Sequence, residues 1–363
     1  MMKRSLLSIP FLLIIFAIFL TGCTSNTTTI GNKGNTTTDI EENTKQPKGI
    51  KESNKEEKFY FTANEGGSIN KIRVADNEVV STIEVDGAVH NIQTSPNGEL
   101  FAVTVVPTAE GGHGDMEMPG LVLFYNSQTD EIQNKVEVGN HPAHVVFTDD
   151  GRYGLVTNNE DNTVSVIDLS TYTVINTIST GEGPHGFRTS KDNKYAYVAN
   201  MGEDTVSVIN IEKMKEEKRI TVGATPVTTD ITSDGKTLVA TLNGENKLAI
   251  IDVESESISK VDVGIGPAQV YIDAKDQFAY VANQGTPEKP SNTLSVIDIK
   301  EKKVITTIET GKGSHGVVVS PNNQFAYVTN MYENSVSIID LETYTVTGTI
   351  QVGETPNGIS IMD

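Results

Sequence analysis

The sequence predicts an all-β protein, a seven-bladed β-propeller with four antiparallel strands in each blade. The first observation is a pattern of strand and turn residues that recurs from Phe59 onward with a period of roughly 42 residues. The second is the number of copies, which are seven: FYFTAN (59–64), FAVTVV (101–106), YGLVTN (153–158), YAYVAN (195–200), TLVATL (237–242), FAYVAN (278–283) and FAYVTN (325–330). A repeat of this length without helical patterns is typical of one propeller blade.

Each repeat contains four short strand patterns, which the copy that begins at Tyr153 illustrates. LVTN (155–158) gives one strand, and TVSVIDL (163–169) alternates apolar and polar residues and gives the next. TVINTIST (173–180) is rich in β-branched residues and predicts the outermost strand. PHGFRTS (184–190) predicts the innermost strand of the following blade. We name the PHGFRTS-like strands a, and the strands that follow them outward b, c and d.

The order of these strands predicts how the ring closes. The first copy begins at a strand b (59–64), and the last strand pattern in the chain is a strand a, TPNGISI (355–361). We therefore expect the C-terminal strand a to pair with the N-terminal strands b, c and d. This pairing completes the first blade and leaves no long unpaired sheet edge.

The N-terminal residues differ from the repeats and predict export. Two basic residues precede an apolar segment that is shorter than the ~20 residues of a membrane span, which is typical of a signal peptide (1–22). The segment ends in Leu-Thr-Gly-Cys, which resembles the lipobox of prokaryotic lipoproteins. The resemblance implies cleavage before Cys23 and a lipid on its thiol. An uncleaved signal anchor is the alternative.

The Thr-, Asn- and charge-rich residues 23–57 predict a disordered stalk, because they offer few apolar side chains to bury. The propeller is expected to occupy residues 58–363. Together these segments predict an extracytoplasmic protein that is anchored to the cell membrane through its N-terminal lipid.

Charge and cysteine content exclude several classes of partner and site. The 363 residues carry a formal net charge of −20, and an acidic surface repels phosphate backbones, so we expect no nucleic-acid partner. The single cysteine, Cys23, excludes an internal disulfide and a Cys-based zinc site. A closed ring is one unit, and we expect a monomer.

Several repeated motifs point to a known family. YVTN (327–330), YVAN (197–200 and 280–283), the SVID-like segments that follow them and the VG–P–G spacer resemble the YVTN family of seven-bladed propellers, which includes surface-layer and YncE-like proteins. The resemblance implies the fold but no particular function. Relatives in the wider set of seven-bladed propellers include lactonase-type enzymes, and a shared fold transfers no chemistry.

The histidines gather at one end of the predicted blades. His90, His185 and His315 occupy the same register at the start of a strand a, and His144 lies one residue further along its strand. His141 lies in the preceding crossover. Because d–a crossovers and b–c turns leave the blades on the same side, we expect these side chains on one loop face, beside the central channel.

A long b–c turn in the second repeat (107–120) adds further candidate ligands to this face. Imidazole and thioether groups without thiolate suit copper, and thioether favours Cu(I). The candidate metal ligands are His90, His113, Met116, Met118, His144, His185 and His315. The alternative is that these side chains hydrogen-bond crossover backbone or face a partner.

Three functions remain open at this stage. The first is a binding or scaffold module that presents its loop face and central channel to a protein or small-ligand partner. The second is a copper-binding or redox-associated protein. The third is a lactonase-like hydrolase or isomerase, for which the strand-a histidines and Arg188 are available. The sequence favours a role without catalysis and assigns no catalytic residue.

Overall fold

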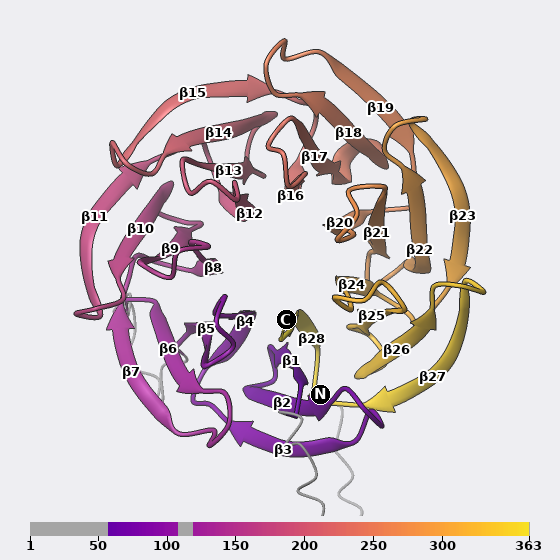
Figure 1. Cartoon of the computed structure of the whole chain (residues 1–363), viewed down its shortest axis with the longest axis horizontal. Helices are drawn as coiled ribbons and strands as arrows, with labels where there is room; N and C mark the ends of the chain where they lie inside the picture. The colour runs from indigo at the N-terminus through magenta and orange to yellow at the C-terminus, as the bar shows by residue number, and fades with distance from the viewer. Residues whose placement is uncertain (1–56, 108–118, 363) are drawn as a thin grey trace, which may run out of the picture. The chain divides into compact units, whose positions relative to one another are not determined.

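The described part of the chain, residues 57–107 and 119–362 of this computed structural model, forms a ring of seven β-sheets (Figure 1). Each sheet has four antiparallel strands and corresponds to one blade. The predicted fold class is therefore confirmed. The predicted signal peptide (1–22), lipidated Cys23 and stalk (23–57) lie outside the described residues almost entirely, and so do His113, Met116 and Met118.

The strands of each blade run outward from the channel in the order a, b, c, d. Blades 1 to 4 are β28 (Pro356–Ile361), β1 (Phe59–Asn64), β2 (Ser68–Arg73), β3 (Val79–Glu84); β4 (Ala88–Thr94), β5 (Leu100–Val106), β6 (Leu121–Asn126), β7 (Ile132–Glu137); β8 (Pro142–Phe147), β9 (Tyr153–Asn158), β10 (Thr163–Asp168), β11 (Thr173–Ser179); and β12 (Pro184–Thr189), β13 (Tyr195–Asn200), β14 (Thr205–Asn210), β15 (Lys215–Thr221).

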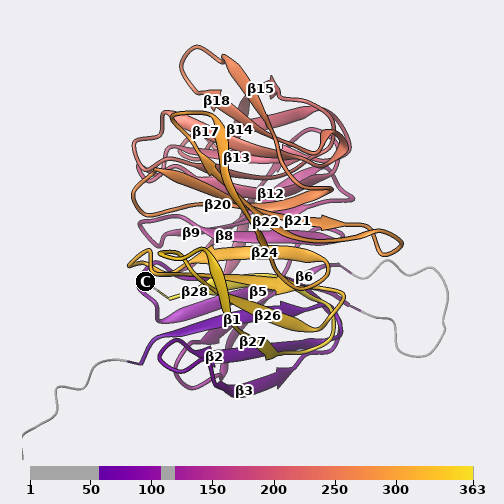
Figure 2. The ribbon, with the colours of Figure 1, turned by 90° about the vertical axis from the view of Figure 1, so that its right-hand side faces the viewer.

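Blades 5 to 7 follow the same plan, with one short 3₁₀ helix, η1 (Asn243–Glu245), between two strands. Their strands are β16 (Pro226–Ile231), β17 (Thr237–Leu242), β18 (Lys247–Asp252), β19 (Ile258–Asp262); β20 (Pro267–Ile272), β21 (Phe278–Gly285), β22 (Pro290–Asp298), β23 (Lys303–Glu309); and β24 (Ser314–Val319), β25 (Phe325–Asn330), β26 (Ser335–Asp340), β27 (Thr345–Gln351). The β21–β22 hairpin extends beyond the neighbouring turns (Figure 2).

The ring closes as the strand order predicts. The C-terminal strand β28 pairs antiparallel with β1, from Tyr60 opposite Ile361 to Asn64 opposite Pro356. Both strands are buried along their whole length. Blade 1 thus contains strands from the two ends of the described chain. Its innermost strand, at the central channel, is β28.

The hydrophobic core lies between adjacent blades. Phe61 of blade 1 and Phe101 of blade 2 face each other with ring centroids 4.5 Å apart, and both are fully buried. Strands b and c supply most of these buried side chains, whereas the outermost strands alternate, as in β3, between half-buried and exposed residues. The inter-blade packing holds the innermost strands, and hence their first residues, in fixed positions around the channel.

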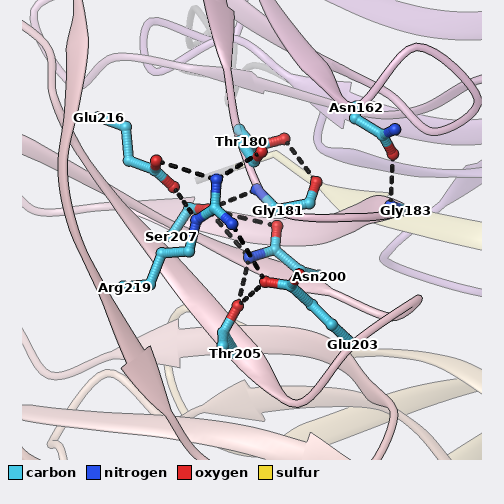
Figure 3. A network of polar contacts seen from close by, with 10 residues as sticks. All are labelled: Asn162, Thr180, Gly181, Gly183, Asn200, Glu203, Thr205, Ser207, Glu216 and Arg219. Carbon is cyan, nitrogen blue, oxygen red and sulfur yellow. Dashed lines mark hydrogen bonds and ion pairs between the residues drawn. The ribbon is translucent and has the colours of Figure 1, made fainter.

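The asparagine that ends the strand-b motif in five of the seven blades belongs to a polar network around the crossover that enters the blade. In blade 4, Asn200 donates to Thr205 Oγ1 at 2.8 Å and to Ser207 Oγ at 2.9 Å, and Ser207 Oγ accepts from the Gly181 backbone (Figure 3). A Cβ at Gly181 would lie 2.4 Å from Asn200 Nδ2, so only glycine fits there. The network fixes the entry into β12.

Candidate metal centre

Three histidines from three adjacent blades meet at the channel. His90, His144 and His185 belong to β4, β8 and β12, and one ring nitrogen of each lies within 4.8 Å of the others. The cluster confirms that the starts of strands a bring distant histidines together. His144 and His185 are buried, with 2% and 8% of their surface exposed, and His90 is partly exposed.

Each of these histidines lies in an irregular step of the ladder between strands a and b. In blade 4 the pairing shifts between Pro184 and Phe187, and His185 lies in that gap. The equivalent shifts enclose His144 in β8 and His90 in β4. A β-bulge re-aims side chains at the rim of a sheet. The bulges therefore interrupt the alternation of side-chain directions along strand a and turn the imidazoles toward the channel.

His185 and His315 use one ring nitrogen in the same way, as their shared register predicts. His185 Nδ1 lies 3.2 Å from the Val227 carbonyl oxygen, and His315 Nδ1 lies 3.0 Å from the Asn357 carbonyl oxygen. In both cases the acceptor lies 42 residues further along, at the start of the next blade. A carbonyl only accepts, so Nδ1 carries the hydrogen and the neutral ring keeps its lone pair on Nε2.

His90 occupies the same register but has different partners. Its Nδ1 lies 3.0 Å from Glu65 Oε1, and the Asn357 side-chain amide donates to the same oxygen at 2.6 Å. Burial raises the pKa of Glu65, but the hydrogen bonds from His90 and Asn357 and the charge of His90 outweigh it and lower the pKa to about 2. The ionised carboxylate accepts from Nδ1, which leaves Nε2 directed at the cluster.

The remaining ring nitrogens of His90 and His185 face each other. His90 Nε2 and His185 Nε2 lie 3.2 Å apart. Two nitrogens that ligate one tetrahedral metal at 2.0–2.1 Å lie about 3.3 Å apart, so the observed separation would suit two ligands on a single ion and equally a hydrogen bond between the rings. Two neutral rings would bring two lone pairs together, whereas a proton on one nitrogen turns the contact into a hydrogen bond. A metal ion 2.0–2.1 Å from both nitrogens would lie off the line that joins them.

His144 is the third member of the cluster, and it is buried without hydrogen bonds to its ring nitrogens. Among the described residues, neither of its ring nitrogens has a hydrogen-bond partner. Burial holds the pKa of His144 well below its usual range, and nearby His185, His90 and Arg188 lower it further. Burial likewise lowers the pKa of His185 to about 3. Both rings are therefore neutral at pH 7, which is the form that ligates metals.

The other described histidines, His141 and His315, lie outside this group. His315 is buried on β24 and lies outside the three-histidine cluster. His141 lies in a crossover, with Nδ1 3.4 Å from Glu160 Oε1 and its side chain 44% exposed. His113, Met116 and Met118 lie outside the described residues, so their part in the site stays a prediction.

Glu65 is the site residue that the sequence analysis missed. It follows the strand-b asparagine of blade 1, and it alone is acidic among the residues aligned with it, which are Pro107, Asn159, Met201, Asn243, Gln284 and Met331. The sequence does contain a signal for Glu65, because it is a charged residue at a repeat position that is otherwise uncharged.

The channel also holds a cavity of about 320 Å³, lined by Arg188, Asp230 and Asp273 among others. Arg188 and Asp230 lie on strands β12 and β16. None of the described histidines lines this cavity. The candidate hydrolase set of strand-a histidines with Arg188 is therefore divided between two places along the channel.

Fold and site together define a seven-bladed propeller with a histidine cluster at the start of its innermost strands. The chain belongs to the YNCE-like beta-propeller family, whose match spans residues 121–363. This confirms the resemblance inferred from the repeated motifs. No curated protein matches the chain. In the described ranges, no helix has the length and apolar character needed to cross a membrane.

Solved structures resemble the chain in fold. Hydrazine synthase of Kuenenia stuttgartiensis is 21% identical with a TM-score of 0.65, over 75% of this chain and 89% of that one. A functionally unknown protein of Desulfotomaculum acetoxidans is 14% identical with a TM-score of 0.71, over 84% and 98%. A putative 6-phosphogluconolactonase of Bacteroides fragilis is 13% identical with a TM-score of 0.69, over 86% and 99%. These identities support the fold alone.

Proposed function

We propose that the protein is an extracytoplasmic, lipid-anchored binding module whose ligand is a transition-metal ion, held by His90, His144 and His185. The binding module and the metal site inferred from the sequence are then one function. Copper(II) is the first candidate, because imidazole suits copper and the divalent series gives copper(II) the highest affinity. Three imidazoles on a four-coordinate ion leave one position for a further ligand.

One observation carries this proposal: the Nε2 atoms of two imidazoles converge at 3.2 Å while the Nδ1 atom of each ring already has a hydrogen-bond partner. The buried, unpartnered nitrogens of His144 beside the pair favour a metal ion over a single shared proton, because a proton serves only two acceptors.

The test is a titration of the full chain, purified without a histidine tag, with Cu(II) and Zn(II) in competition with a chelator of known affinity. We expect one equivalent of bound metal. His185→Ala should weaken binding at least 100-fold. His315→Asn, which alters a histidine of the same register outside the cluster, should leave it unchanged. Wild-type protein without stoichiometric metal would overturn the proposal.

The anchoring part of the proposal is tested separately. Cys23→Ala removes the expected lipidation site, so the variant should move from the membrane fraction to the soluble fraction after export. A variant that stays in the membrane fraction would favour the uncleaved signal anchor instead.

A further inference from the structure

We infer that Glu65 is a positioning residue of the metal site, whose carboxylate fixes the tautomer and orientation of His90 for metal binding. The inference rests on the proposed function, because it requires a metal ion at the histidine cluster. Glu65 belongs to blade 1, whereas the three proposed ligands belong to blades 2, 3 and 4. Its carboxylate contacts His90 Nδ1, the ring nitrogen that does not face the cluster, so it acts on a ligand.

The contact has the geometry of an outer partner of a metal ligand. Glu65 Oε1 accepts from His90 Nδ1 at 3.0 Å, and this leaves Nε2 directed at the cluster. Metal-bound histidines commonly donate their second N–H to a carboxylate or a backbone carbonyl, which orients the ring and raises its basicity. His185 has the carbonyl version of this arrangement, at Val227. His90 has the stronger, charge-assisted version.

Asn357 holds the carboxylate in place. Its side-chain amide donates to the same Glu65 oxygen at 2.6 Å, and its backbone carbonyl accepts from His315. Asn357 is 2% exposed and lies on β28. Glu65 is thus fixed from two sides, by the ligand His90 and by the closing strand of the ring.

The aligned position has a purely structural use in other blades. Asn159 donates its side-chain amide to the Pro184 carbonyl, and Asn243 donates to the Pro267 carbonyl, in each case at the start of the next blade. An ionised carboxylate has no hydrogen to donate. Glu65 therefore forgoes this inter-blade bond and bonds an imidazole instead, which is the expected change where a structural position has become part of a site.

The experiment compares full-length wild type, Glu65→Gln and Glu160→Gln. Glu160 is the matched control, because its carboxylate lies 3.4 Å from a histidine of the same face, His141, that is outside the cluster. Cu(II) and Zn(II) affinities are measured by chelator competition, and the Cu(II) complexes by electron paramagnetic resonance. We expect Glu65→Gln to weaken both affinities about 10- to 100-fold at unchanged stoichiometry and to shift the Cu(II) spectrum. Glu160→Gln should change neither.

The outcomes separate the two proposals. If wild type binds metal and Glu65→Gln binds it equally well with the same spectrum, the positioning role is overturned and the metal site stands. If Glu65→Gln only lowers the unfolding temperature of the metal-free protein, Glu65 is structural and the inference is also overturned. If wild type binds no metal, the proposed function fails and the inference fails with it.

Discussion

The Nε2 atoms of His90 and His185 lie 3.2 Å apart although 95 residues separate them in the chain. They belong to blades 2 and 4, and the intervening blade 3 contributes His144 to the same cluster. The channel geometry brings them together, because every blade presents the start of its innermost strand there.

Replacing His144 by phenylalanine should separate stability from metal binding. The variant removes two buried ring nitrogens that have no described partner, each of which costs about 1–3 kcal/mol, and keeps a ring of similar shape. We expect metal-free His144→Phe to unfold at the same temperature as wild type or higher, while its Cu(II) affinity falls at least 100-fold. Thermal unfolding and competition titration check this. A marked loss of stability would show that His144 is structural.

The metal-free protein should become less stable as the pH is lowered, because the buried His315 resists protonation in the folded state. Burial lowers the pKa of His315 to about 4, although its hydrogen bond to Asn357 opposes the shift. The unfolded state therefore takes up the proton first, so stability is unaffected above pH 6.5 and falls as the pH drops from 6.5 toward 4, by about 3 kcal/mol.

His315→Asn is the comparison for this pH effect, because its side-chain amide can donate near the position of Nδ1 without titrating. Denaturant unfolding at several pH values, with a chelator present, should give a shallower pH dependence for the variant than for wild type. Superimposable pH profiles would exclude His315 as a source of the effect.

Alanine at Gly181 should destabilise the ring by about 1–3 kcal/mol, since the new methyl group would overpack a filled site. Its Cβ would lie 2.4 Å from Asn200 Nδ2 and would disrupt the network that fixes the entry into β12. Gly154→Ala is the control, because its Cβ would meet nothing closer than 3.6 Å. Urea unfolding measures both, and equal effects would contradict the argument.

Removing the closing strand should unfold the whole ring rather than one end. A chain that ends at Gly353 lacks β28 and leaves the buried strand β1 without its inner neighbour. We expect loss of the cooperative unfolding transition and rapid proteolysis throughout. A chain that ends at Met362 is the control and should behave like wild type. A truncated chain with six blades that still unfold cooperatively would disprove this.

The fold could be predicted from the sequence because every signal is local and repeated. Strand length, alternation and turn residues recur in each copy, and the strand order alone predicts the pairing of β28 with β1. The repeated asparagine also has a local role, since Asn158 and Asn200 make equivalent contacts with the strand-c hydroxyls of their own blades.

The site could be predicted only in part, because the position of a residue in the repeat does not determine which partner its side chain contacts. His90, His185 and His315 are equivalent in the repeat, yet His90 turns to Glu65 while the other two donate to carbonyls. That difference depends on Glu65, from a different blade. The thioether ligands predicted at Met116 and Met118 lie outside the described residues and stay predictions.

The pairing of β28 with β1 also has a consequence for folding. The two strands lie at opposite ends of the described chain, so β1 keeps an open edge until β28 pairs with it, even when the other six blades have formed. An exposed strand edge invites pairing with other chains. The sequence FYFTAN, which is fully buried in the closed ring, is consequently open to pairing with other chains until β28 takes its place beside it.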